Sequence, residues 1–517
     1  MSKKKLLRIT PLACSAALML TLAACEKENT TPAPNPPPTG GTTPPVTTPP
    51  TGQSVDVQGE ITTNTTWTAA NKYLLKGFVY VRSGATLTIE PGTIIKGDKD
   101  TKGALIIEPG AKIEAKGTVA KPIVFTSNQP KGARNYGDWG GVIIAGNAPV
   151  NPTDRPVIEG GPTTRYGTVN VTDPNSPLKA DNSGTLQYVR IEFSGIAFSP
   201  NNEVNGLTLA GVGSGTTIDH IQVSYNGDDS FEWYGGAVNA KYLVSHRAFD
   251  DDFDTDFGFT GKVQFGVSLR DPLQADQSGS KAFESDNDGN SSNNLPRTAP
   301  VFSNITAIGP LLNPSPQANI SNQYTAGAHL RRNTSTSILN SVIVGYPTGV
   351  LIDNGVTAAR IAANELVFKN NIVAGSLTNS NSVRGQRDII YVGPSGGPSN
   401  LTPNNTMSSD SAAWGSAVGP LTWLKASGNR RYTTADNVQL LNPFNLTAPS
   451  FLPRTASPIV TVSPATAPAA PANFTDAKVS DPFFTKVDYI GAFSGSGNSA
   501  DNWMAGWTNF DPQNTDY

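Results

Sequence analysis

Short runs of alternating hydrophobic and polar residues recur along this chain. "TIEPGTIIK" (88–96) and "IIEPGAKIE" (106–114) share one pattern at an offset of 18, namely a short strand, a Pro-Gly turn and another short strand. "DHIQVSYNGDDSF" (219–231) aligns with "KYLVSHRAFDDDF" (241–253) at an offset of 22, and "KVQFGVSL" (262–269) continues the series. The period of two predicts β-strands, and the offsets predict an internal repeat.

Related segments recur at 302–309, 339–345 and 368–375, again without helical periodicity. Short β-branched strands at such spacings are typical of a parallel β-helix, in which stacked windings share one continuous core. A β-sandwich is the alternative, but its strands need not repeat in sequence. We therefore predict an all-β protein, a parallel β-helix over 57–395.

Aspartate and glutamate gather in one part of the repeat. The segments "SFEWY" (230–234), "DFDTD" (252–256) and "AFESD" (282–286) align on their phenylalanines. Alternate residues of a strand face the same way, so these phenylalanines are predicted to point inward and the residues after them outward. The acidic residues expected to stack on the outer face are Asp228, Asp229, Glu232, Asp250, Asp251, Asp254, Asp256, Glu284 and Asp286.

Such a stack predicts a cation site. Two like charges about 5 Å apart repel by roughly 3 kcal/mol at an effective dielectric of about 20, unless a cation, protonation or solvent relieves them. Calcium suits a wall of carboxylate, amide and carbonyl oxygens, because it takes six to eight oxygen ligands in flexible geometry. A solvated acidic face and another metal remain the alternatives.

The next winding carries basic residues where the earlier ones carry acidic residues. In "HLRRN" (329–333), Leu330 aligns with the phenylalanines and Arg331 with Glu284. Arg331 is expected either to neutralise the end of the acidic stack or to act as a base or anion clamp beside a calcium ion.

The composition excludes several classes of function. The chain has 517 residues, a net charge of −3 and 15% charged residues, so it lacks the basic field that nucleic acid requires. Its two cysteines, Cys14 and Cys25, lie near the N-terminus, which excludes a disulfide framework or a cysteine zinc site in the body. No glycine-rich phosphate loop is found.

The first 24 residues are predicted to be an export signal. Basic residues precede an apolar stretch that ends in Leu-Ala-Ala-Cys, which resembles a bacterial lipobox and makes Cys25 the expected lipidated residue. Residues 25–56 are rich in Pro and Thr and form the expected tether. The predicted location is the outer membrane, facing outward and held by lipid alone.

The last part of the chain, 396–517, is expected to be loop-rich and to cap the final windings, because the repeat weakens there. Trp503, Trp507 and Phe510 are expected to pack in this cap, with glycan binding as the alternative. Trp139, in "GDWGGVIIAGNAPV" (137–150), is likewise expected to pack over the early windings.

Two resemblances follow from these residues. The architecture resembles the right-handed parallel β-helix of the pectate-lyase type. Several sequence motifs are similar to those of a family of Bacteroidota surface lipoproteins of unknown function. They are "GDDSFEWYGG", "DDDFDTDFGF", "FESDNDG", "HLRRNTS" and "NWMAGWTNFDP".

The first resemblance implies an enzymatic alternative, a calcium-dependent polysaccharide lyase. Its metal ligands would come from the acidic stack, and its base would be Lys262, Arg270 or Arg331, although no lyase signature surrounds these residues. Glycoside hydrolases of the same fold use paired aspartates, which "DDDFDTD" (250–256) could supply. The favoured prediction is a binding or surface-structural module for polysaccharide, with calcium on its acidic face. The sequence leaves the oligomeric state open.

Overall fold

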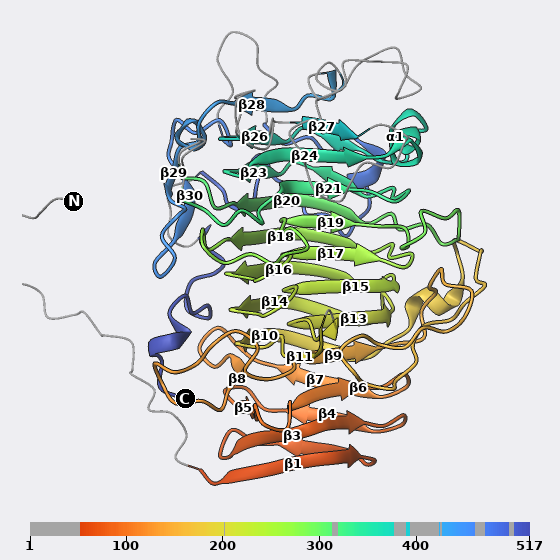
Figure 1. Cartoon of the computed structure of the whole chain (residues 1–517), viewed down its shortest axis with the longest axis vertical. Helices are drawn as coiled ribbons and strands as arrows, with labels where there is room; N and C mark the ends of the chain where they lie inside the picture. Colours follow the sequence, from red (N-terminus) through yellow and green to blue (C-terminus); the bar gives the residue numbers. More distant parts are fainter. Residues whose placement is uncertain are drawn as a thin grey trace, which may run out of the picture. The chain divides into compact units, whose positions relative to one another are not determined.

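In the large sheet, strands pair in parallel with those of the windings before and after them (Figure 1). The computed structural model describes residues 52–200, 202–312, 319–376, 389–392 (backbone only), 423, 426–460, 471–495 and 501–517. All of them belong to one unit, Pro49–Tyr517. The predicted signal segment and Cys25 lie outside the described residues.

The windings build three parallel sheets, here called faces A, B and C, and each winding crosses them in that order. Face A contains the first parts of β1 (Ser54–Ile61) and β3 (Lys72–Val81), then β5 (Ile94–Gly97), β8 (Ile123–Ser127), the second parts of β10 (Gly184–Glu192), β14 (Thr217–Ser224), β16 (Asn239–His246), β18 (Lys262–Leu269) and β20 (Val301–Ile308), and finally β23 (Val342–Val344), β26 (Ile372–Ala374) and β28 (Arg430–Tyr432).

Face B carries the acidic segments. It contains the second parts of β1 and β3, then β6 (Ala104–Ile107), β9 (Val142–Ala145), β13 (Leu207–Val212), β15 (Phe231–Gly236), β17 (Phe253–Asp256), β19 (Phe283–Ser285), β21 (Ala326–Leu330), β24 (Thr348–Asp353) and β27 (Ile389–Val392). Face C contains β2 (Thr65–Trp67), β4 (Thr86–Ile89), β7 (Lys112–Lys116), the first parts of β10, β14, β16, β18 and β20, then β22 (Ser337–Leu339) and β25 (Phe368–Lys369).

Few elements lie outside these faces. They are the antiparallel hairpin β11 (Ala197–Ser199) and β12 (Asn202–Glu203), the antiparallel pair β29 (Leu440–Asn442) and β30 (Ser450–Pro453), helix α1 (Gly355–Ala362) and the short 3-10 turns Pro177–Ala180, Ala435–Val438, Ala477–Val479 and Pro512–Asn514. The predicted all-β parallel β-helix is therefore confirmed. β1 begins before residue 57, and β28 adds a rung to face A after residue 395.

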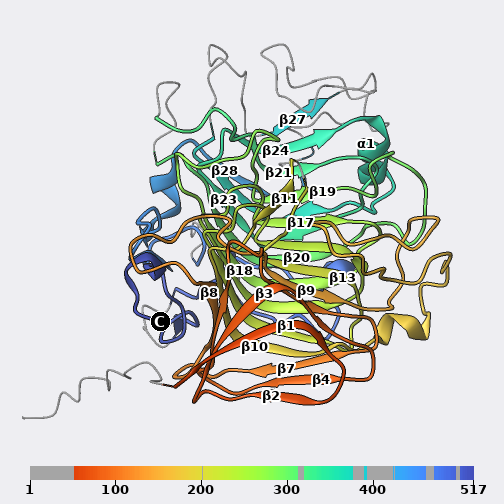
Figure 2. The ribbon, with the colours of Figure 1, turned by 60° about the horizontal axis from the view of Figure 1, so that its bottom comes forward.

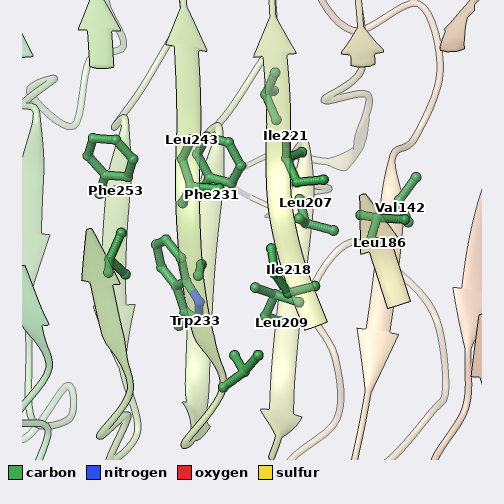
Figure 3. Packing of buried hydrophobic residues seen from close by; sticks show 14 of the residues in the cluster. Val142, Leu186, Leu207, Leu209, Ile218, Ile221, Phe231, Trp233, Leu243 and Phe253 are labelled. Carbon is green, nitrogen blue, oxygen red and sulfur yellow. The ribbon is translucent and has the colours of Figure 1, made fainter. Parts of the chain in front are cut away.

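Stacked inward residues form the core (Figure 3). Phe231, Phe253 and Phe283 stand opposite one another in successive strands, as the sequence predicts, and their rings lie 5.8 and 5.4 Å apart. Leu207 continues this ladder into the earlier winding. Burial of each such side chain contributes about 1.5–3 kcal/mol to the free energy of folding.

Where face C turns into face A, one residue of each late winding adopts a left-handed backbone. These bend residues, stacked in register, are Tyr188, His220, Tyr242, Phe265, Asn304, Asn340 and Asn370. Asparagine tolerates this conformation, whereas aromatic residues adopt it rarely. The aromatic bends gain ring stacking in return, with centroids 4.3 Å apart between Tyr188 and His220 and between His220 and Tyr242.

Residues 471–495 and 501–517, here called the C-terminal strap, lie along face A (Figures 1 and 2). Asn340 donates to the Asn473 carbonyl (3.1 Å), Gln222 exchanges two hydrogen bonds with the backbone of Asn509, and the Tyr517 hydroxyl donates to Glu192 (2.7 Å). The strap thus runs from the late windings back to the early ones, whereas the sequence predicted a cap over the final windings.

The position of the strap follows from the outer surface of face A, which is apolar along much of its length. Val244, Val267, Val342 and Ile372 point away from the solenoid interior and form a second core with the C-terminal residues. Trp507 is 1% exposed in this core, which confirms its predicted packing role. Trp139 is also fully buried, and its indole nitrogen donates to the Glu192 carbonyl (2.8 Å), which confirms packing for that residue as well.

Candidate functional site: the acidic column of face B

The pairing of β15, β17 and β19 brings three carboxylates into one column. Glu232 stands opposite Asp254, and Asp254 opposite Glu284. Neighbouring parallel strands lie about 4.8 Å apart, so residues distant in sequence become neighbours in space. The predicted stacking of these three acids is confirmed.

The turns before these strands stack too. The Asp251 amide donates to Asp229 Oδ1 (2.7 Å), and the Lys281 amide donates to Asp251 Oδ1 (2.6 Å). The Asp250 amide donates to the Asp228 carbonyl (3.3 Å). Each turn is therefore fixed by the next winding, which holds its carboxylates in place.

Two groups of three carboxylates result, and Asp229 belongs to both. Oxygens of Asp228, Asp229 and Asp250 lie within 4.8 Å of one another, and so do oxygens of Asp229, Glu232 and Asp254. Buried Asn205 supports both groups, because its amide nitrogen donates to Glu232 and its oxygen accepts from the Asp229 amide (3.3 Å). Within each group, the three oxygens are close enough to share one small cation.

Burial and mutual repulsion disfavour the ionised forms. Burial first, and neighbouring carboxylates second, raise the pKa of Asp228 and Asp229 well above the usual range. The same two causes raise the pKa of Glu232, which has Glu159 nearby, and the pKa of Asp254, which has Glu232 and Glu284 nearby. Without a cation, several of these groups hold protons at a pH where aspartate is ordinarily charged.

Other acids of the predicted set have protein partners instead. Lys281 lies 3.5 Å from Asp251 and contacts Glu284, and Arg331 binds both Glu284 and Asp286 (2.8 Å to the latter). Burial alone would raise the pKa of Glu284, but Arg331 and Lys281 outweigh it and hold that pKa well below its usual range. Asp256 accepts the Phe257 amide (2.6 Å). Four of the nine predicted ligands are thus engaged elsewhere.

The other five predicted ligands line a cavity of about 960 Å³, and they are Asp228, Asp229, Glu232, Asp250 and Asp254. Further acids form its rim, namely Glu159 between β9 and β10, Glu203 of β12, and Asp276 between β18 and β19. The sequence analysis missed these three, because they lie on connections outside the repeat that revealed the others.

A smaller cavity of about 280 Å³ adjoins the first. Glu159, Glu232 and Asp254 line both, and the Tyr234 hydroxyl donates to Glu159 (2.6 Å) between them. The side chains confined to the smaller cavity are Val157, Tyr166, Tyr234, Asp256, Phe257, Asp286, Arg331 and Arg332.

The fold agrees with a comparison to protein families. Residues 59–419 match the model of the pectate-lyase-like β-helix domain. The chain belongs to this family. Searches of curated proteins and of solved structures found no match. Membership of the pectate-lyase-like family thus establishes the fold.

The lyase alternative within this family requires a basic side chain free to remove a proton. Arg270 is 1% exposed and paired with Asp252 (3.0 Å), and Lys262 is paired with Asp481 (2.9 Å); neither lines the two cavities described above. Arg331 lines only the smaller one, where burial alone would lower its pKa but Glu284 and Asp286 raise it. All three are poor proton acceptors as placed.

The predicted register of Arg331 was wrong. Ala328 stands opposite Phe283, His329 opposite Glu284, and Leu330 opposite Ser285. Arg331 therefore follows the strand, and its side chain reaches back to Glu284 and Asp286. The long connection between β19 and β21 hid this shift, and alanine in place of the next phenylalanine removed the sequence marker.

Proposed function

We propose that this protein is a lipid-anchored, outward-facing binding module that holds calcium on the acidic column of face B and contacts polysaccharide there. The observation that carries the proposal is the pair of carboxylate groups sharing Asp229, with oxygens within 4.8 Å, on the floor of a cavity. One ion, or two, would offset the repulsion that raises the pKa of these acids.

Calcium fits the donor set better than other common ions. It accepts six to eight oxygens at irregular angles, whereas magnesium demands near-octahedral geometry and zinc prefers nitrogen and sulfur ligands. The carboxylates that would hold it are Asp228, Asp229, Glu232, Asp250 and Asp254. Among the described residues no helix is long and apolar enough to cross a membrane. The proposed anchoring rests on Cys25 and on the Pro/Thr-rich tether.

Calcium titration of chelator-stripped protein tests the proposal. We expect saturable heat of binding, a higher unfolding temperature with calcium and weaker binding of magnesium. The variant Asp229→Asn should lose most of the affinity, because Asp229 belongs to both carboxylate groups, and Asp56→Asn on an exposed strand should not. Stripped protein that takes up no calcium at millimolar concentration would refute the proposal.

A glycoside hydrolase is the second candidate. Carboxyl groups of raised pKa can act as general acids, and retaining enzymes need two carboxyls roughly 5 Å apart. Oxygens of Glu232 and Asp254 lie within 4.8 Å of one another, which is close to that range. Release of reducing ends from a polysaccharide panel, undiminished by chelator, would favour the hydrolase over the binding module.

Formation of unsaturated uronate, read by ultraviolet absorbance and lost in Arg331→Ala, would instead support a lyase.

A further inference from the structure

The large cavity exceeds the needs of any ion. At about 960 Å³ it has the size of a ligand pocket, and the two carboxylate groups form only part of its lining. Its wall contains the rings of Tyr136 and Phe249, whose centroids lie 6.0 Å apart. Aromatic surface in a polar pocket offers contact to the C–H face of a sugar ring.

The charge of the lining selects among sugars. Eight carboxyl groups line the cavity, namely Glu159, Glu203, Asp228, Asp229, Glu232, Asp250, Asp254 and Asp276, against one ammonium group, that of Lys99. Two divalent cations would cancel four of the eight charges. A uronate or a sulfated sugar would therefore still meet a negative surface.

The basic side chains among the described residues of the two cavities already pair with protein carboxylates. Lys99 is bound to Asp138 (2.9 Å). In the smaller cavity Arg331 is bound to Glu284 and Asp286, and Arg332 to Asp286 (2.6 Å). An acidic glycan would have to compete with these carboxylates for the same cations, and any ion pair it displaced would leave a buried carboxylate without that partner.

We infer, on the basis of the proposed function, that the glycan bound here is uncharged and lies across both cavities. Its hydroxyls donate to the rim carboxylates and coordinate calcium on the floor, and its ring faces contact Phe249 and Tyr136. Three residues, Glu159, Glu232 and Asp254, line both cavities. The glycan passes over them from one cavity to the other.

Titration of the calcium-loaded full chain with four probe classes tests this inference. The probes are neutral oligosaccharides from dextran, mannan and xylan, oligomers of polygalacturonate, oligomers of chitosan, and spermine. We expect at least one of the neutral oligosaccharides to bind at least tenfold more tightly than polygalacturonate, chitosan or spermine. Chelator should abolish that binding. Tighter binding of polygalacturonate, chitosan or spermine would overturn the inference, as would calcium binding with no response to any neutral sugar.

Three variants locate the binding. Glu159→Gln and Phe249→Ala should each weaken the sugar at least tenfold and leave calcium affinity unchanged, since neither residue belongs to the carboxylate groups on the floor. Tyr80→Ala, on β3 and outside both cavities, is the control and should bind as the parent protein does. Unchanged sugar affinity in both site variants would overturn the location. Calcium is titrated separately, so loss of calcium binding refutes the proposed function, whereas normal calcium binding with the wrong sugar class refutes only this inference.

Discussion

At the scale of single residues, an acidic side chain on face B has one of two environments, set by its neighbours in the adjacent windings. Glu284 has Arg331 and Lys281 beside it and is held ionised. Asp254 lies between the carboxylates of Glu232 and Glu284, and burial together with those charges raises its pKa. The first arrangement stabilises the folded chain without help, and the second favours uptake of a cation.

Asp254→Asn should separate stability from binding. Without calcium the variant should be more stable by about 1–2 kcal/mol, because a repelling charge is removed from a partly solvated site. With calcium the order should reverse, as affinity falls at least tenfold. Chemical unfolding with chelator and with calcium measures both effects, and equal stability of variant and parent under both conditions would contradict the prediction.

His246 predicts a dependence of stability on pH. Its Nε2 donates to the Leu446 carbonyl (2.8 Å), its ring packs on Phe510 and Tyr225, and burial, with Arg247 nearby, lowers its pKa to about 3 from 6.5. The unfolded chain therefore binds the proton more readily. The stabilisation is complete above pH 6.5 and is lost as the pH falls toward 3.

His246→Gln lacks this titration and serves as the comparison. Between pH 6.5 and 4.5 the parent should lose about 2.3 kcal/mol more free energy of unfolding than the variant. Parallel curves for the two proteins, measured by denaturant unfolding at each pH, would show that the histidine is not buried as a neutral group.

At the scale of elements, inward residues set the register of neighbouring strands. The sequence predicted the register of β15, β17 and β19 because all three carry phenylalanine at the same position. It failed at β21, where Ala328 takes that position. Glu159 and Glu203 could not be predicted at all, because no repeat fixes where a connection between strands folds back.

Arg331→Gln tests whether this arginine is structural. The change leaves Glu284 and Asp286 with fewer cationic partners, so we expect a loss of about 3–5 kcal/mol in the free energy of unfolding. Calcium affinity of the folded fraction should remain within a few fold. The exposed Arg155→Gln is the control. A stable variant that has lost only ligand binding would instead give Arg331 a direct role at the site.

At the scale of the described unit, the C-terminal strap joins windings that are otherwise connected only to their neighbours. Trp507 packs edge-on against Tyr188 and His220, at centroid distances of 5.8 and 5.6 Å. The strap reaches the early windings at Arg134, which donates to the Pro512 carbonyl (2.6 Å). Unfolding of one winding must therefore disturb contacts with several others.

Trp507→Ala should destabilise the unit by about 3–5 kcal/mol, the usual cost of removing a large buried side chain. We expect proteolysis of the variant to begin in the strap, followed by loss of the windings beneath it. The exposed Leu441→Ala is the control. Cleavage that begins instead at the first windings would show that the strap does not hold the later ones.

A strap fastened at many points also fixes the size of the repeat. An open solenoid can gain or lose a winding by duplication or deletion, since each winding needs only its neighbours. Here one extra winding would shift everything beyond it by about 4.8 Å relative to the strap, and Gln222, Asn340 and Glu192 could not all keep their partners. The length of the strap therefore fixes the number of windings that it can span. The number of windings should change in evolution only when the length of the strap changes too.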